Sequence, residues 1–318
     1  MLWRERKVSK SERKGIVVLH SFLFHYSSEK AFGQLLGDAD EPTDERRGVV
    51  KRLPTNEQGE LTPEILEKCI LQYSQKGYRR FAVFLTAGTI NFGSIDQIGA
   101  INTVLERLQR ELGITVTIHV DAAFGGFVIP FVEPNCHFAF QNSLVNSISL
   151  DAHKTGGIPY SAGIFLCRKG LLEYTKTAAP YIFGHEDYTV PGSRSGAIAA
   201  ACWATFQHYG YEGYASMAAQ CMNVRNYLTE RFQKIPGVIT YPSRVNILTV
   251  RFQHLLDENL RIRYCIVPCT FPIPLSRKER DGNSAFRGHM AKAYRFALMP
   301  HVTTEHIDKF FHEWRKQK

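Results

Sequence analysis

The sequence has no apolar run long enough to span a bilayer, and no apolar segment follows the charged residues at its start. We therefore expect neither a membrane-spanning protein nor a cleaved signal peptide. Repeats and low-complexity tracts are also missing, which argues against fibrous and disordered classes. Apolar residues make up 44% and charged residues 22% of the 318 residues, a balance typical of a globular protein.

The cysteines are irregularly spaced. The chain has seven cysteines, an odd number, and the two closest are Cys265 and Cys269. No further cysteine or histidine pair near them completes the ligand set of a zinc site, so we predict no metal site. Free thiols suit a reducing compartment, which predicts a cytoplasmic protein.

Acidic residues are fewer than basic ones, at 30 against 39, and the formal net charge is +9. The basic residues are spread along the chain, with the densest run at Trp3-Arg4-Glu5-Arg6-Lys7, and no aromatic stacking motif follows that run. This distribution favours a solvated basic surface over a nucleic-acid interface. We expect neither a nucleic-acid nor a membrane partner.

Strand and helix patterns alternate through the first part of the chain. Apolar runs predict buried strands over residues 15–19, 80–85, 116–120, 145–150 and 162–167. Helical patterns cover 27–36 (with Gly37 as a stop), 62–76, 96–112, 197–209 and 214–234. A charged helix or tail is expected over 1–14 and a charged loop over 38–47. The alternation predicts an α/β fold whose sheet is covered on both faces.

The pattern changes after Pro236-Gly237. Strands are predicted over 246–252 and 294–298, and a closing helix over 303–316. We therefore predict a large domain over residues 1–236 and a small C-terminal α/β domain over residues 237–318.

Three predicted strands end in unusual polar segments: Thr86-Ala-Gly-Thr89, Asp121-Ala-Ala123 and Asp151-Ala-His-Lys154. Ligands of open α/β sheets bind at the carboxyl ends of the strands. A lysine just past a buried strand can act as a nucleophile, because burial favours the neutral amine. The alternative for Lys154 is a lysine whose ammonium group reaches solvent.

Asp121 points to one kind of ligand. The small residues after it, including Ala123, leave room for a flat molecule, and a carboxylate can keep the ring nitrogen of a pyridine cofactor protonated. The alternative is a turn or capping residue. His25 lies between a strand and a helix, where it could stack on such a ring or simply begin the helix. Thr86 could hydrogen-bond the cofactor or cap the helix that follows.

These residues belong to longer runs, which together resemble the group II pyridoxal-phosphate-dependent amino-acid decarboxylases, nearest to the archaeal-type L-tyrosine/L-aspartate decarboxylase family. The order of the runs matches the family, and they cover nearly all of the chain. The runs are His25-Tyr-Ser-Ser-Glu-Lys-Ala31, Thr86-Ala-Gly-Thr89, Gly93-Ser-Ile-Asp96, His119-Val-Asp-Ala-Ala-Phe-Gly-Gly-Phe-Val-Ile-Pro-Phe131, Ser147-Ile-Ser-Leu-Asp-Ala-His-Lys154, Gly192-Ser-Arg-Ser-Gly-Ala197 and Arg295-Phe-Ala-Leu-Met-Pro-His301.

The resemblance implies the aminotransferase-like type I fold: a mixed, mostly parallel sheet between helices with a small C-terminal domain, assembled as a homodimer. It also implies decarboxylation of an L-amino acid, tyrosine-like or aspartate, with pyridoxal 5'-phosphate as cofactor. Three residues would bind the ring of this cofactor: Lys154 as a Schiff base, Asp121 at the pyridine nitrogen and His25 over the ring. His153 and Ser149 would lie near the phosphate, and Ala123 and Thr86 would also contact the cofactor.

Three further roles follow from the resemblance. Tyr181 falls on the loop that returns a proton to the substrate Cα, and Tyr188 is its rival for this role. Arg194 and Arg295 match family arginines, and Arg295 is the better candidate for the substrate carboxylate, which an arginine holds bidentately.

The chain departs from the family at two places. The Ser-Gly-Gly-Thr-Glu-Ala-Asn-type loop that holds the cofactor phosphate at a helix N-terminus has no counterpart, and Ile90 replaces a polar residue usual after Thr89. A late start of the given sequence or a decayed gene would explain the missing loop. We therefore expect the chain as given to bind the cofactor weakly and to be unstable alone. Two alternatives stay open: a non-catalytic truncated paralogue, and a carbon–carbon lyase of the sphingosine-phosphate lyase type.

Overall fold

The structure, a computed structural model, describes residues 15–36, 48–181, 183–184, 186–189, 192–272 and 290–316. The predictions for residues 1–14, for Gly37 and for the loop over 38–47 lie outside the described residues. Within these ranges, no helix combines the length and the apolar character that crossing a membrane requires.

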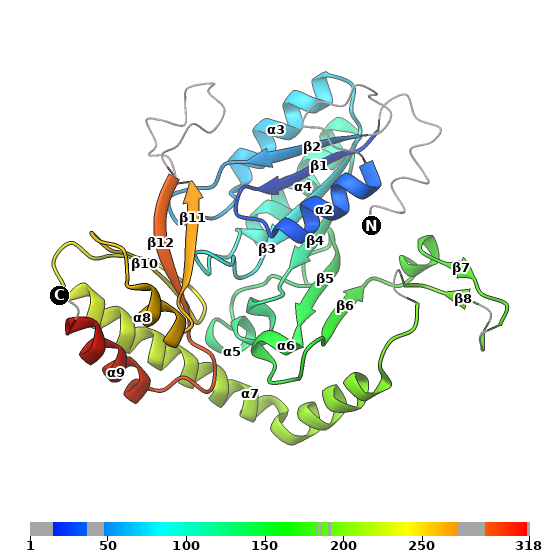
Figure 1. Ribbon diagram of the computed structural model, residues 1–318. Helices are drawn as coiled ribbons and strands as arrows, with labels where there is room; N and C mark the ends of the chain where they lie inside the picture. The colour runs from blue at the N-terminus through cyan, green and yellow to red at the C-terminus, as the bar shows by residue number, and fades with distance from the viewer. Residues whose placement is uncertain are drawn as a thin grey trace.

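In the described part of the chain the main sheet has six strands, in the order β2-β1-β3-β4-β5-β6 (Figure 1). The first five run parallel, and β6 pairs antiparallel with β5. Their bounds are β1 Val17–Ser21, β2 Val49–Leu53, β3 Arg80–Thr86, β4 Thr115–Asp121, β5 Val145–Asp151 and β6 Gly163–Cys167. The predicted mixed, mostly parallel sheet is confirmed.

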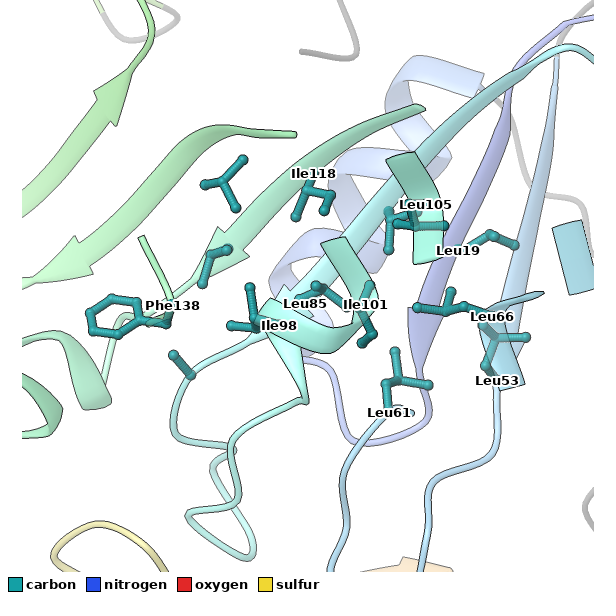
Figure 2. Packing of buried hydrophobic residues seen from close by; sticks show 14 of the residues in the cluster. Leu19, Leu53, Leu61, Leu66, Leu85, Ile98, Ile101, Leu105, Ile118 and Phe138 are labelled. Carbon is teal, nitrogen blue, oxygen red and sulfur yellow. The ribbon is translucent and has the colours of Figure 1, made fainter. Parts of the chain in front are cut away.

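Helices cover both faces of this sheet, and strands β1 and β3 place apolar residues on both sides. Helices α3 (Pro63–Gln75) and α4 (Ile98–Leu112) pack on one face, where Leu66, Ile101 and Leu105 meet strand residues such as Leu19, Leu85 and Ile118 (Figure 2). Helix α2 (Tyr26–Leu36) packs on the other face through Phe32 and Leu36. The period of two along a strand sends neighbouring residues to these two separate cores.

The two predicted helices, over 197–209 and 214–234, are present as the two parts of α7 (Gly196–Gln233), which is kinked between them. Gly210 interrupts it with non-helical angles, φ 54° and ψ −165°. A positive φ is readily adopted only by glycine, so the kink is located where the sequence supplies one. The part after the kink carries Val224, Leu228 and Phe232 into a second core.

That second core lies under an antiparallel sheet with the order β11-β12-β10-β9, four strands within the described residues. Their bounds are β9 Ile239–Tyr241, β10 Ile247–Arg251, β11 Val267–Pro272 and β12 Met290–Ala297. Helices α8 (Glu258–Arg263) and α9 (Thr304–Arg315) complete this part of the protein (Figure 1). The predicted domain boundary near residue 236 falls between α7 and β9, and it stays a prediction.

The remaining elements are short. Helices α5 (Ile129–Val132) and α6 (Ala152–Thr155) follow β4 and β5, and strands β7 (Thr177–Ala178) and β8 (Glu186–Asp187) form a small hairpin. Figure 1 shows this hairpin on the opposite side of the molecule from the second sheet.

Candidate active site

The site is built where parallel strands end side by side. Strands β1, β3, β4 and β5 are neighbours in the sheet, so their carboxyl ends share one edge. Thr86 is the register partner of Asp121, and Asp121 is the partner of Ser149. These three side chains therefore form one row across three strands, at the position where the sequence placed the polar strand ends.

A pocket of about 420 Å³ opens over this row. Its volume lies within the roughly 300–1,000 Å³ usual for small-molecule and cofactor sites. The structure brings seven of the ten predicted site residues into the pocket lining: His25, Thr86, Asp121, Ala123, Ser149, Lys154 and Arg295.

Lys154 lies on α6, directly after β5. Its Nζ is 2.8 Å from Asp151 Oδ2, and its side chain is 33% exposed. The expectation of a buried amine is therefore met only in part, because the Lys154 ammonium group is paired with Asp151 and Lys154 lines the pocket. Helix α6 is held in place by Thr155, whose hydroxyl donates to Phe124 O at 2.9 Å.

Asp121 ends β4 and is largely buried. Its Oδ1 accepts a hydrogen bond from the Ala123 amide at 3.0 Å, while Oδ2 has no hydrogen-bond partner among the residues that the structure describes. Burial raises the pKa of Asp121, and the Ala123 amide and the Lys154 ammonium oppose that rise. A cationic group beside Oδ2 would restore the charged carboxylate.

His25 begins the turn between β1 and α2. Its Nδ1 lies 2.7 Å from Ser27 Oγ and accepts a longer bond from the Ser27 amide at 3.3 Å. Burial, followed by the nearby Lys154 ammonium, lowers the pKa of His25. The ring is therefore neutral at pH 7 and suited to stacking on a flat ligand.

Arg295 reaches the pocket from the second sheet. It lies on β12, is partly buried, and donates from Nη1 to Ile90 O at 3.3 Å. The pocket is thus completed by both sheets, which places a guanidinium opposite the strand ends of the main sheet.

Three predicted residues lie outside the pocket lining. The His153 ring bonds to Ala162 O through Nδ1 at 3.1 Å, Tyr181 is 91% exposed, and Arg194 is exposed. The rival phenol, Tyr188, donates to Glu186 Oε2 at 2.6 Å and also lies outside the lining. The roles of these residues stay predictions.

The sequence reasoning missed His119 as a site residue. His119 Nδ1 lies 2.9 Å from Ser147 Oγ and Nε2 lies 3.2 Å from Ser149 Oγ, so the ring joins two hydroxyls beneath the pocket. Burial lowers the pKa of His119 to about 4, which keeps it neutral at pH 7. Its position two residues before Asp121 was the available signal, because residues two apart on a strand share a face.

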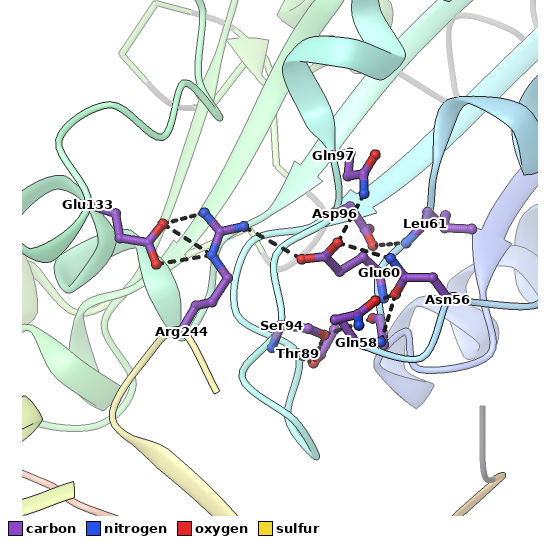
Figure 3. Close-up of polar contacts among 11 residues, drawn as sticks. Asn56, Gln58, Glu60, Leu61, Thr89, Ser94, Asp96, Gln97, Glu133 and Arg244 are labelled. Atoms are coloured by element: carbon purple, nitrogen blue, oxygen red, sulfur yellow. Dashed lines mark hydrogen bonds and ion pairs between the residues drawn. The ribbon is translucent and has the colours of Figure 1, made fainter. Parts of the chain in front are cut away.

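Asp96 was also misplaced: the predicted helix starts only at Ile98, and Asp96 is a buried carboxylate before it. Its Oδ1 accepts from the Leu61 amide at 2.7 Å (Figure 3). Its Oδ2 accepts from the Thr86 amide, also at 2.7 Å. Burial raises the pKa of Asp96 to about 7. The carboxyl group fixes the end of β3, where Thr86 enters the pocket.

A cation joins the two sheets nearby. Arg244, just before β10, donates from Nε to both carboxylate oxygens of Glu133 at 3.0 and 3.1 Å (Figure 3). Its Nη1 lies 3.7 Å from Glu60 Oε1, on the loop before α3. These ion pairs fasten the segment leading into the second sheet to the main domain.

Comparison with known proteins agrees with this geometry. Residues 17–254 match the model of the pyridoxal-dependent decarboxylase conserved domain. A probable L-tyrosine/L-aspartate decarboxylase of Methanothrix thermoacetophila is 33% identical over 70% of this chain and 53% of its own length. The L-aspartate decarboxylase of Thermococcus kodakarensis is 33% identical over 75% of this chain and 58% of its own.

The fold is similar to that of solved decarboxylase structures. The crystal structure of L-methionine decarboxylase from Streptomyces sp. 590 superimposes with a TM-score of 0.77 and 19% identity, over 98% of this chain and 74% of that one. The chain spans about half the length of the first two curated relatives. From the match over residues 17–254 and the 33% identity to these relatives, the chain belongs to the pyridoxal-dependent decarboxylase family.

Proposed function

We propose that the chain carries the catalytic site of a pyridoxal-phosphate-dependent L-amino-acid decarboxylase. The observation that carries this proposal is the meeting of Lys154 and Asp121 in one pocket, at the ends of adjacent parallel strands. An amine that can bind an aldehyde and a carboxylate for a ring nitrogen are the two groups that this cofactor requires.

The residues present fit the ring half of the cofactor. Asp121 lines the pocket and its Oδ2 is unpaired among the described residues, His25 offers a neutral ring, and Ala123 contributes only a small side chain to the lining. Thr86 Oγ1 is buried beside the pocket and has no hydrogen-bond partner in the described part of the chain, so a ligand oxygen would satisfy it.

When bound, pyridoxal phosphate supplies an electron-accepting ring that stabilises negative charge on the substrate Cα after carbon dioxide leaves. Lys154 would hold the cofactor covalently through its amine. Asp121 would keep the ring nitrogen protonated, and Arg295 would hold the substrate carboxylate. Tyr181 would then return a proton to Cα.

Further parts of the proposal concern the whole protein. His153 and Ser149 would lie near the cofactor phosphate, and Arg194 would assist substrate binding. We propose a homodimer, because Tyr181 and Arg194 are exposed in the single chain and a second subunit could complete the site. All seven cysteines lie in the described ranges as free thiols, which supports a cytoplasmic location.

The test is chemical trapping of the cofactor. Protein mixed with pyridoxal phosphate is reduced with borohydride, digested and mapped by mass spectrometry. We expect the label on Lys154, no label in Lys154→Ala, and full labelling in the matched control Lys169→Ala, which removes an exposed lysine. Label on another lysine in the intact protein would overturn the assignment, and labelling without carbon dioxide release would favour a non-catalytic paralogue.

A further inference from the structure

The charges that line the pocket are few. The ionisable lining residues are His25, His119, Asp121, Asp151, Lys154 and Arg295. Lys154 is already paired with Asp151, and in the proposed function its amine holds the cofactor. Within the described residues, Arg295 is then the one lining cation left for a substrate carboxylate.

Several of the pocket residues near Arg295 are aliphatic. Its guanidinium bonds to the carbonyl of Ile90, which places Ile90 beside it. Ala297 lies two residues further along β12, on the same face as Arg295, and its register partner on β10 is Ile247. Ile90, Ile247 and Ala297 all line the pocket, together with Leu23. A substrate held by Arg295 therefore meets an aliphatic wall.

Within the described residues, the pocket lining offers a second carboxylate no cation besides Lys154 and Arg295. Burial lowers the pKa of both His25 and His119, so neither ring carries a charge at pH 7. The remaining ionisable groups, Asp121 and Asp151, are acids. Moving a carboxylate out of water without a partner is strongly unfavourable, whereas burying an aromatic or aliphatic group is favourable.

We propose that this pocket selects L-amino acids with one carboxylate and an apolar or aromatic side chain, rather than aspartate or glutamate, and that Ile90 is the residue that sets this preference. The inference rests on the proposed function, because it takes Arg295 as the binder of the substrate carboxylate and Lys154 as the cofactor lysine.

The first experiment compares substrates on the cofactor-loaded protein. Carbon dioxide release is measured with L-tyrosine, L-tryptophan, L-methionine, L-aspartate and L-glutamate. We expect kcat/KM for the aromatic substrates to exceed that for aspartate by at least about 100-fold. Turnover of aspartate at an equal or higher kcat/KM would overturn the preference and leave the decarboxylase proposal standing. Release from none of the five would instead count against the proposed function.

A binding measurement tests the wall independently of turnover. Calorimetric titration compares 3-phenylpropionate with succinate, which are both unreactive acids. Each can place one carboxylate on Arg295, and succinate has a second carboxylate where 3-phenylpropionate has a phenyl ring. We expect 3-phenylpropionate to bind at least about tenfold more tightly. Equal or tighter binding of succinate would overturn the inference, even where no substrate is turned over.

Variants then test Ile90 itself. Ile90→Lys supplies the missing cation, and we expect it to shift the ratio of the succinate and 3-phenylpropionate affinities by at least about tenfold toward succinate. Ile262→Lys is the matched control: it adds the same charge on α8, at a position that is 62% exposed and outside the pocket lining, and should leave the ratio unchanged. Ile90→Leu keeps the wall apolar and should preserve the wild-type ratio. A ratio that Ile90→Lys leaves unchanged, or shifts no further than Ile262→Lys, would refute the role of Ile90.

Discussion

The buried Asp96 carboxyl group makes the stability of the fold depend on pH. It is almost completely buried, and both of its oxygens accept amide hydrogen bonds, from Leu61 and Thr86. Burial raises its pKa from an ordinary 3.8 to about 7, because the desolvation of the charge outweighs the stabilisation of the carboxylate by the two hydrogen bonds. A difference of this size between the folded and unfolded states corresponds to about 4 kcal/mol.

The direction follows from linkage. A pKa that is higher in the folded state means that the folded protein binds the proton more tightly. The stabilisation is fully present below pH 3.8 and is lost as the pH rises through about 7. Of the total, about 2–3 kcal/mol should be lost between pH 5 and pH 8.

Asp96→Asn isolates this contribution. The amide keeps one acceptor and loses the other, so at pH 5 the missing hydrogen bond costs about 1–3 kcal/mol. The asparagine cannot ionise. The free energy of unfolding of the variant, relative to that of the wild type, should therefore rise by about 2–3 kcal/mol between pH 5 and pH 8. Urea unfolding at both pH values measures the difference, with the exposed Asp257→Asn as the control, since asparagine also caps helices well.

A wild-type-minus-variant difference that stays constant from pH 5 to pH 8 would refute the reasoning. It would mean that the two amide donors keep Asp96 ionised throughout, and that burial is the weaker effect. Because the comparison is between two proteins at the same pH, the titration of every other group cancels.

The other predictions concern catalysis and the junction between the sheets. Asp121→Asn should still bind the cofactor but lose on the order of 10²–10³-fold in kcat, measured as carbon dioxide release; near-normal turnover would make Asp121 a turn residue. Tyr181→Phe should bind cofactor normally yet divert product from amine to oxidised side products, resolved by chromatography, whereas Tyr188→Phe should give amine normally; the reverse result moves the role to Tyr188. Arg244→Met should lower the free energy of unfolding by about 1 kcal/mol, since its ion pair with Glu133 is partly exposed, and an unchanged urea midpoint would show that the pair contributes nothing.

The buried strands could be predicted from the sequence because their physics is local. The run Phe81–Leu85 is apolar on both faces, which only a sheet covered on both sides can accommodate. Strand β2 escaped prediction because it is an edge strand with exposed Lys51 and Arg52 in its middle. The antiparallel direction of β6 escaped as well, because an apolar run does not encode which way its strand points.

The site could be predicted in part for a related reason. Parallel neighbouring strands bring their carboxyl ends together whatever the rest of the chain does, so Thr86, Asp121 and Lys154 had to converge once the sheet formed. Asp96 could not be foreseen, because its burial depends on amides 10 and 35 residues away. The exposure of Tyr181 depends likewise on how a loop packs, which periodicity does not describe.

The two halves of the proposed chemistry depend on different sheets, and one loop connects them. The residues proposed to hold the cofactor ring lie at the strand ends of the main sheet, whereas Arg295 lies on the second sheet. Between them, the carbonyls of Ile90, Asn91 and Gly93 accept hydrogen bonds from the Arg295 side chain, the Thr249 hydroxyl and the Arg244 amide.

This loop leaves β3 at Thr86 and ends at Asp96, whose carboxyl group bonds back to the Thr86 amide. The loop is therefore closed at its base by the main sheet and held at its tip by the second. Loss of carbon dioxide requires that the bond from Cα to the carboxylate keep a fixed orientation to the ring, so a shift between the sheets would cost rate even with every catalytic residue intact. Changes that loosen the tip of the loop should consequently lower kcat more than they weaken cofactor binding, because the residues proposed to hold the cofactor ring lie at the strand ends of the main sheet.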